Sequence, residues 1–205
     1  MVGLFITLEG GDGSGKSTQS AILAEWLRGR GRTVVVTREP GGTALGLELR
    51  EIILHSRSYI APRAEALIYA ADRAHNIATV VRPALERGEV VIQDRYIDSS
   101  VAYQGAGRVL DPAEVRGLSA WGTESLDPDL TILLDLDVDA GRARLNAAEK
   151  DFDRLEAEKQ EFHERVRTGF LQIASAEPER VAVVDASRSV QEIAATIRSR
   201  VVALL

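Results

Sequence analysis

The sequence predicts an α/β fold in which a five-stranded parallel sheet is covered by helices on both faces. Five short apolar runs alternate along the chain with segments of helical periodicity. The runs are almost continuously apolar, which is typical of parallel strands buried on both faces. The 205 residues, of which 45% are hydrophobic, are enough for one full core. We find no second core-sized region and therefore expect a single domain over residues 1–205.

The expected strands are recognised by their composition and by the residues that end them. The first run, Leu-Phe-Ile-Thr-Leu, ends at Glu9 and a glycine pair. The second, Thr-Val-Val-Val-Thr, is β-branched throughout, which favours a strand. The third, Val-Val-Ile-Gln, ends at Asp94 and Arg95. The five expected strands cover residues 4–8, 33–37, 90–93, 130–136 and 181–185.

Helices are expected between these strands. They cover residues 16–28, 45–54, 62–87, 155–174 and 190–204, with short helices within 99–121. Pro62 suits the first turn of the third helix, and Pro83 is expected to kink or divide it. Asp111 and Pro112 favour a helix start. The densely charged stretch 139–160 is the one region that we expect to be mobile.

Charge and composition exclude several classes of protein. The net charge of −6 argues against broad coating of nucleic acid, which needs a basic surface. No apolar run approaches the roughly 18 residues of a membrane span. The absence of cysteine excludes disulfides, thiolate zinc sites and iron–sulfur clusters. The N-terminus lacks the basic start of a signal peptide. We therefore expect a cytoplasmic protein without nucleic-acid or membrane partners.

The segment Gly10–Ser17 fits the phosphate-loop pattern G-x-x-x-x-G-K-[ST], and it follows an expected strand and opens an expected helix. Glycines let backbone N–H groups surround phosphates, and the helix N-terminus adds positive charge. Lys16 is expected to bridge the β- and γ-phosphates of a nucleotide, and the Ser17 hydroxyl to bind Mg²⁺. The alternative is a glycine-rich turn with an exposed Lys16. The expected nucleotide-binding residues of this loop are Gly10, Gly11, Asp12, Gly13, Ser14, Gly15, Lys16, Ser17 and Thr18.

This motif makes the predicted fold similar to that of the phosphate-loop NTP hydrolases, and two further strand ends extend the site. Asp94 follows the third strand, at the sheet edge where such folds bind ligands, and suits a Mg²⁺ site. The alternative is that Asp94 caps the next turn. Arg38 and Arg95 would share that edge and leave two guanidinium groups for a second anion. This arrangement suggests phosphoryl transfer between two phosphorylated molecules.

Three other classes of phosphate-loop protein are alternatives to such a phosphotransferase. A GTPase would need an N-K-x-D segment, but the only asparagines are Asn76 and Asn146, neither followed by lysine. A kinase for another nucleoside monophosphate is the second reading, although adenylate-kinase-like loops usually carry proline where Asp12 stands. The third is a phosphate-loop binding protein without turnover. The intact Lys16 and Asp94 argue against it.

Five segments together resemble the bacterial thymidylate kinases over nearly the whole chain. They are Gly10–Thr18, Thr37–Thr43 (Thr-Arg-Glu-Pro-Gly-Gly-Thr), Asp94–Tyr96 (Asp-Arg-Tyr), Ser99–Gly105 (Ser-Ser-Val-Ala-Tyr-Gln-Gly) and Asp153–Glu156 (Asp-Arg-Leu-Glu). The resemblance implies transfer of the ATP γ-phosphoryl group to dTMP, giving dTDP for dTTP synthesis. It also implies Mg²⁺ as cofactor and a homodimer.

The resemblance assigns the phosphate and sugar of dTMP to four residues. Arg38 and Arg95 hold the acceptor phosphate. Asp12 lies near the 3′-hydroxyl and the Mg²⁺ region. Tyr103 lies against the deoxyribose, where it would crowd a 2′-hydroxyl. The whole implied dTMP-binding set is Asp12, Arg38, Tyr69, Arg73, Arg95, Ser99, Ser100, Tyr103 and Gln104.

The resemblance assigns the thymine base to the rest of that set. Tyr69 stacks on the base, Arg73 approaches its edge, and Ser99, Ser100 and Gln104 line the pocket. Tyr69 and Arg73 are four residues apart, so both face one side of the expected helix. The alternative for Tyr69 is an aromatic of the core.

A charged lid is expected at about residues 141–154. Some relatives carry arginine where this chain has Gly13, and chains without it supply cations from the lid, which here contains Arg142, Arg144, Lys150 and Arg154. Such cations stabilise the charge that develops on the γ-phosphoryl group. The alternative, favoured for Lys150, is a solvated charged helix. The expected catalytic residues are Asp12, Lys16, Arg95, Arg142 and Arg154, and the expected metal ligands are Ser17 and Asp94.

Overall fold

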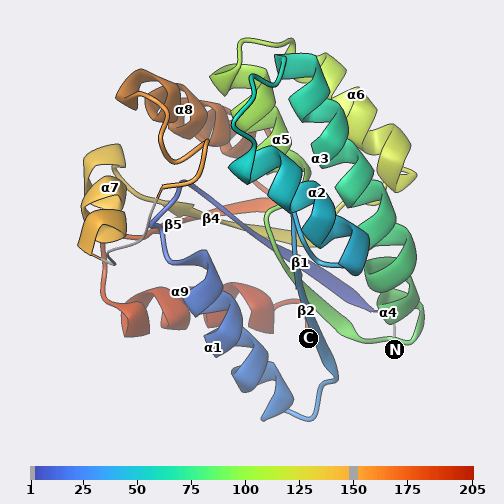
Figure 1. Cartoon of the computed structure of the whole chain (residues 1–205). Helices are drawn as coiled ribbons and strands as arrows, with labels where there is room; N and C mark the ends of the chain where they lie inside the picture. Colours follow the sequence, from blue (N-terminus) through green and yellow to red (C-terminus); the bar gives the residue numbers. More distant parts are fainter. Residues whose placement is uncertain (1–2, 148–151) are drawn as a thin grey trace.

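The computed structural model describes residues 3–147 and 152–205. Its centre is a five-stranded sheet in the order β2-β3-β1-β4-β5, and every pairing in it is parallel. The strands are β1 (Leu4–Glu9), β2 (Val34–Arg38), β3 (Val90–Asp94), β4 (Leu130–Asp135) and β5 (Val181–Asp185). Helices lie on both sides of the sheet (Figure 1). The predicted fold class is therefore confirmed.

The helices follow the predicted alternation. They are α1 (Lys16–Arg28), α2 (Ala44–His55), α3 (Pro62–Asn76), α4 (Arg82–Glu86), α5 (Ile97–Ser100), α6 (Pro112–Thr123), α7 (Val138–Ala147), α8 (Gln160–Ala176) and α9 (Val190–Val202), with π-helical segments η1 (Ile77–Val81) and η2 (Val101–Gly107). Start signals are visible in the sequence. The Thr43 side chain caps α2, Asp111 caps α6, and Ser189 forms a capping box with Glu192 at α9.

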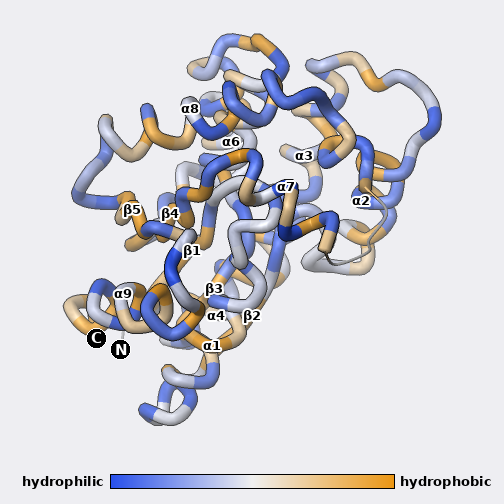
Figure 2. Tube along the Cα trace, turned by 90° about the vertical axis from the view of Figure 1, so that its left-hand side faces the viewer, coloured by the Kyte–Doolittle hydropathy of each residue, from blue (hydrophilic) through white to orange (hydrophobic). Residues whose placement is uncertain are grey.

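The core has one part on each side of the sheet. Helices α1 and α9 cover one face, where Leu23 and Ile197 pack with Ile6 of β1. Segments α3, α6, α8 and η2 cover the other face, where Phe170 packs against Leu133 of β4. In Figure 2, hydrophobic residues gather along β4 and β5, and the surrounding loops carry many hydrophilic residues. Among the described residues, no helix is long and apolar enough to span a membrane.

The strand register brings the predicted functional segments to one edge. Asp94 lies beside Leu8 of β1 and Arg38 of β2. Glu9, the last residue before the phosphate loop, lies beside Leu133 of β4. Because all strands are parallel, their carboxyl ends meet at this edge, where open α/β sheets bind ligands. The sheet therefore positions the phosphate loop between the ends of β3 and β4.

Two predicted helices differ in detail from those observed. The helix expected over 62–87 is divided by the π-helical segment Ile77–Val81 just before Pro83, because proline has no N–H for the helical ladder. The helix expected from residue 155 begins at Gln160 instead. The Asp153 side chain accepts hydrogen bonds from the N–H groups of Leu155 and Glu156, both at 2.9 Å, and so holds a turn there. Of the expected lid, Lys150 lies outside the described residues.

Candidate functional site

The phosphate loop joins β1 to α1 with a backbone that requires glycine. Gly10 and Gly13 have positive φ angles of 133° and 75°. A Cβ atom at Gly10 would lie 2.4 Å from the Leu134 carbonyl oxygen, and one at Gly13 would lie 2.5 Å from the Gly141 carbonyl oxygen. The loop is therefore packed between β4 and α7 at two points where only glycine fits. Ser17 and Thr18 are exposed on the first turn of α1.

Lys16 is buried at the start of α1 and folds back onto the loop. Its Nζ donates to the carbonyl oxygens of Gly10 at 3.1 Å and Gly11 at 2.9 Å. Burial and the neighbouring Arg95 lower the pKa of the Lys16 amino group, while nearby carboxylates oppose this. Burial would raise the pKa of Asp12, but Arg95 and Lys16 outweigh it and lower that pKa. The loop thus holds an ionised carboxylate beside two cations.

A hydroxyl and a carboxylate meet where a metal site was expected. The Ser17 Oγ donates to Asp94 Oδ2 at 2.9 Å, across the gap between α1 and the end of β3. Both groups offer the hard oxygen ligands that Mg²⁺ prefers, and Mg²⁺ commonly takes its other ligands from phosphates and water. The donor set present therefore fits Mg²⁺.

Arg95 connects the phosphate loop to η2. Its guanidinium pairs with Asp12 Oδ1 and donates to the hydroxyls of Ser99 and Tyr103, both at 3.2 Å. The Tyr103 hydroxyl donates in turn to Asp12 Oδ2 at 3.0 Å. Burial and the adjacent Asp12 raise the pKa of the Tyr103 phenol, although Arg95 opposes this, so the phenol keeps the proton that it donates. Asp12, Arg95 and Tyr103 are thus each bonded to the other two, although Asp12 is more than 80 residues away in the chain.

A pocket opens beside this contact, between α2, α3 and η2. It is lined by Asp12, Glu39, Pro40, Arg50, Leu54, Tyr69, Arg73, Arg95, Ser99, Ser100, Tyr103, Gln104, Asp153, Leu155 and Glu156. We call it the acceptor pocket. The lining includes every residue of the expected dTMP-binding set except Arg38. The residues that were grouped as one binding set from the sequence, apart from Arg38, therefore line one pocket in the structure.

Arg38 lies elsewhere at the same edge. Its side chain is exposed and lines a separate groove between α1 and β2, together with Ser17 and Asp94. The strand position was predicted correctly, since Arg38 lies beside Asp94 in the sheet. In this conformation its guanidinium lies on the metal-site side of that edge and outside the acceptor pocket. Glu39, which follows it, precedes a cis bond to Pro40.

Arg73 is almost completely buried and its guanidinium is held by four hydrogen bonds. Its Nε donates to Glu39 Oε2 at 2.8 Å and its Nη1 to the Ser119 hydroxyl at 2.9 Å. Its Nη2 donates to the Tyr96 carbonyl at 3.1 Å and the Ser100 hydroxyl at 3.0 Å. A guanidinium has five N–H donors. Within the described part of the chain, one Nη1 hydrogen therefore has no hydrogen-bond partner.

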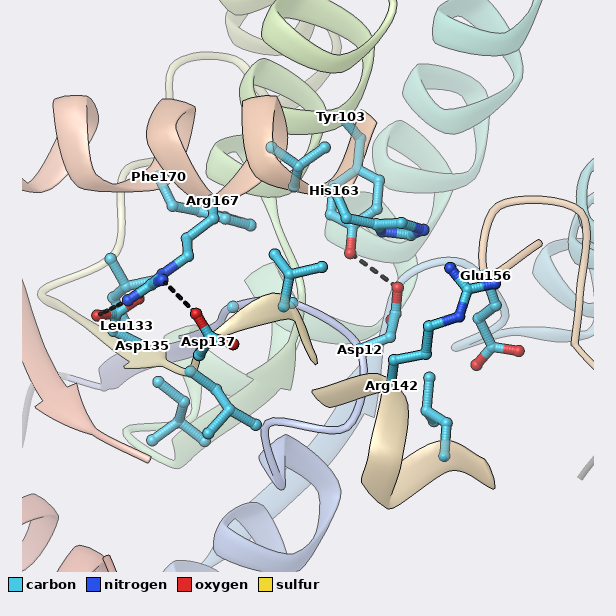
Figure 3. Close-up of a pocket in the computed structure, with 17 residues that line it drawn as sticks. Asp12, Tyr103, Leu133, Asp135, Asp137, Arg142, Glu156, His163, Arg167 and Phe170 are labelled. Carbon is cyan, nitrogen blue, oxygen red and sulfur yellow. Dashed lines mark hydrogen bonds and ion pairs between the residues drawn. The ribbon is translucent and has the colours of Figure 1, made fainter. Parts of the chain in front are cut away.

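A second pocket lies on the other side of Asp12, between the end of β4, α7 and α8 (Figure 3). Arg142 of α7 and His163 of α8 line it with Asp12. Across the pocket, Arg167 holds Asp135 at 2.8 Å and Asp137 at 3.3 Å (Figure 3). These ion pairs tie α8 to the strand end from which α7 starts. Two of the expected lid cations therefore lie next to the phosphate loop. Arg142 lines this pocket with Asp12, and Arg144 donates from its Nη1 to the Gly13 carbonyl at 3.3 Å.

Arg154, the other expected lid cation, lies in a different cluster. Its Nη2 donates to Glu65 Oε2 of α3 at 2.5 Å, and its Nε to the Ile53 carbonyl at 2.8 Å. Among the described residues, it lines neither the acceptor pocket nor the pocket beside Arg142. In this conformation Arg154 fixes the end of the lid to α2 and α3.

Sequence reasoning missed Glu9, a buried carboxylate that supports Arg95. Glu9 Oε1 accepts the Tyr96 N–H at 2.7 Å and its Oε2 accepts the Ser99 hydroxyl. These bonds hold the chain just after Arg95, whose φ is 68°. Burial, with the nearby Asp98, raises the pKa of Glu9 to about 7. A charged residue ending a buried strand was the signal that could have revealed it.

The fold and this pair of adjoining sites define a phosphate-loop phosphotransferase of the nucleotide kinase type. The chain matches the family described as Thymidylate kinase over residues 8–197. It is 68% identical to a thymidylate kinase of Clavibacter michiganensis over 100% of this chain and 97% of that protein. It is 72% identical to one of Leifsonia xyli over 97% and 94%. The chain belongs to the thymidylate kinase family.

A solved structure agrees with this assignment. The crystal structure of thymidylate kinase from Ehrlichia chaffeensis is similar to this chain with a TM-score of 0.80 and 32% sequence identity. The similarity covers 98% of this chain and 99% of the other. The fold similarity therefore extends over the helices that form both pockets.

We predict that Glu9→Gln flattens the pH dependence of stability. Because the Glu9 pKa is about 7 in the folded protein and 4.5 ordinarily, the folded state retains a proton that the unfolded state loses. Ionisation of Glu9 therefore lowers the free energy of unfolding as pH rises from 4.5 to 7, by up to about 1.4 kcal/mol per pH unit, and the loss levels off above that range. Urea unfolding at several pH values measures this slope. A Glu9→Gln slope equal to the wild-type slope would contradict the assignment.

Proposed function

We propose that this chain transfers the γ-phosphoryl group of ATP to dTMP, giving dTDP, with the phosphate loop holding ATP and the acceptor pocket holding dTMP. The observation that carries the proposal is the contact of Asp12 with Arg95 and Tyr103. Asp12 belongs to the phosphate loop and also lines the acceptor pocket. Two phosphorylated molecules bound on either side of it would meet at their phosphates.

The donor side uses the loop, Lys16 and Mg²⁺. The backbone N–H groups and the start of α1 attract the ATP phosphates. Lys16, now on the Gly10 and Gly11 carbonyls, has the reach and the charge to bind the β- and γ-phosphates. Ser17 and Asp94 would hold Mg²⁺, which when bound neutralises phosphate oxygens.

The acceptor phosphate is held by Arg95, which is already oriented by Asp12 and Ser99. No strong general base is needed, because a phosphate monoester is already anionic at pH 7. Arg38 is proposed to join Arg95 from the neighbouring groove once the acceptor phosphate is present. Tyr103, held against Asp12, is proposed to face the deoxyribose and to exclude a 2′-hydroxyl.

The thymine base is proposed to stack on Tyr69 and to be read at its edge by Arg73. The guanidinium of Arg73 is fixed by Glu39, Ser119 and Ser100, so its remaining Nη1 hydrogen is available in a defined direction. A hydrogen donor suits the O4 carbonyl of thymine and opposes the amino group at that position of cytosine. Ser99 and Ser100 line the same pocket.

The lid is proposed to supply Arg142 to the transferring phosphoryl group. Arg142 lines the pocket beside Asp12 and lies over the ring of Phe152, with 5.6 Å from its Cζ atom to the ring centroid. Closure of the lid would also exclude water, which would otherwise hydrolyse ATP. Arg154 would have to leave Glu65 to take that role.

A homodimer is proposed through helices α2, α3 and α6, which pack side by side on one flank of the molecule (Figure 1). Several large apolar side chains are exposed on them. They are Leu45, Leu47 and Ile52 of α2, Leu67 of α3 and Trp121 of α6. Exposed apolar patches on soluble proteins typically mark interaction surfaces.

We predict that dTMP is the preferred acceptor. Release of ADP from ATP and Mg²⁺ is measured with dTMP, dUMP, AMP, CMP and GMP, and kcat/KM should be highest for dTMP. Lys16→Ala serves as the control, since loss of its charge should lower kcat by at least about a hundredfold with a smaller effect on the dTMP KM. Preference for AMP, or no turnover with any acceptor, would contradict the proposal.

We predict that Arg142→Ala and Arg154→Ala differ in kinetics. Arg142→Ala should lower kcat by roughly 10³, the lower end of the range for such arginines, with little change in the dTMP KM. Arg154→Ala should act mainly on the dTMP KM, because it releases Glu65 near the acceptor pocket. Steady-state measurements of kcat and of the dTMP KM for both variants test this difference. The reverse pattern would assign the lid cation to Arg154.

We predict that Trp121→Glu shifts the protein from dimer to monomer. Trp121 is 82% exposed in the single chain, and a buried charge at a dimer interface is costly. Light scattering coupled to size-exclusion chromatography measures the mass. Val109→Glu, which changes a 77% exposed residue outside these helices, should leave the mass at that of a dimer. A Trp121→Glu variant that stays dimeric would place the interface elsewhere.

A further inference from the structure

Gln104 of η2 contacts a carboxylate that belongs to neither substrate site. The Gln104 side chain is buried and lines the acceptor pocket. Its Nε2 donates to Oε1 of Glu65 at 2.9 Å. Glu65 lies on α3 four residues before Tyr69 and eight before Arg73, so these three residues share one helical face. Glu65 itself is fully buried and does not line the pocket.

Glu65 is held as an ionised carboxylate by two arginines. Arg108 donates to both of its oxygens at 3.2 Å, and Arg154 donates to Oε2 at 2.5 Å. Burial alone would raise the pKa of Glu65. The hydrogen bonds from Arg108, Gln104 and Arg154 outweigh burial and lower that pKa below its ordinary value. An ionised carboxylate can only accept hydrogen bonds.

The charge of Glu65 therefore determines which way the Gln104 amide faces. The two ends of a glutamine amide are opposite in character: the nitrogen donates and the oxygen accepts. With Glu65 restricted to accepting, Gln104 must direct its Nε2 to Glu65. Its Oε1 receives no hydrogen bond from the described residues and stays available to the pocket. The Gln104 oxygen is thus an acceptor available to the pocket, alongside the remaining Nη1 donor of Arg73 and in addition to the carboxylates and hydroxyls that also line the pocket.

This pair of groups matches thymine and opposes cytosine. Thymine presents a carbonyl acceptor at position 4 and an N–H donor at position 3, whereas cytosine presents a donor and an acceptor at those positions. We propose that Glu65 is a positioning residue that sets base specificity by holding the Gln104 amide with its oxygen toward the base. The inference rests on the proposed function, since it concerns the same acceptor pocket.

The test compares dTMP with 5-methyl-dCMP, which differs from dTMP only in the donor and acceptor pattern of the base. In Glu65→Gln the neutral amide at residue 65 can donate as well as accept. The side-chain amide of Gln104 can then rotate by half a turn and present its nitrogen to the base. We expect the ratio of kcat/KM for dTMP to that for 5-methyl-dCMP to fall by about ten- to a hundredfold, the value of one to two hydrogen bonds. The dTMP KM should rise, with kcat changed less than threefold.

Glu158→Gln is the matched control. Glu158 binds the same arginine, Arg108, at 2.5 Å but does not contact Gln104. The control makes the same change of carboxylate to amide in the same ion-pair cluster, and it should keep the wild-type ratio. A fall in the ratio as large in Glu158→Gln as in Glu65→Gln would overturn the proposal.

Gln104→Met is a second variant that tests the same interaction, and it can be used if Glu65→Gln folds poorly. It removes the amide at similar length and leaves the ion pairs of Glu65 intact. It should lower the ratio as far as Glu65→Gln does, and the double variant should show no further loss, because Glu65 acts through Gln104. An unchanged ratio in Gln104→Met, or losses that add, would overturn the proposal. Absence of dTMP phosphorylation in the wild type would instead refute the proposed function.

Discussion

The ionic contact between Arg95 and Asp12 is the constraint on which the rest of the site depends. It joins the phosphate loop to the segment that follows β3, and Arg95 makes it from a backbone position with a φ of 68°, which is unfavourable for a residue with a side chain. Glu9 supports that conformation by binding the Tyr96 N–H and the Ser99 hydroxyl, which follow Arg95 in the chain. The guanidinium that we propose for the acceptor phosphate is thus supported by a buried carboxylate, Glu9.

The sheet order explains why these groups can meet at all. β1 is central, and β3 and β4 flank it in the order β2-β3-β1-β4-β5. The loop after β1 therefore has the end of β3, with Asp94 and Arg95, on one side and the end of β4 on the other. The acceptor pocket forms on the first side, and the pocket beside Arg142 forms on the second. Asp12, between them, lines both.

The strands, their alternation with helices and their parallel arrangement could be predicted from the sequence, because burial on both faces leaves a clear apolar pattern. The meeting of Asp94, Arg38 and the phosphate loop at one edge of the sheet followed from that arrangement. The sequence also predicted that Tyr69 and Arg73 share a helical face, and the same reasoning, taken four residues further back, reaches Glu65. Partners were not predictable. Glu9 meets Ser99 across 90 residues of chain, and Arg154 meets Glu65 across 89. Such contacts depend on how separate elements pack, which no local pattern records.

The close approach of the phosphate loop to α7 has a consequence for how far either segment can vary. A Cβ at Gly13 would lie 2.5 Å from the Gly141 carbonyl oxygen, and one at Gly141 would lie 2.7 Å from the Asp12 carbonyl oxygen. A side chain at either position therefore collides with the backbone of the other segment. A residue larger than glycine fits at either position only if the loop and α7 shift apart, so this pair of glycines fixes the spacing between them.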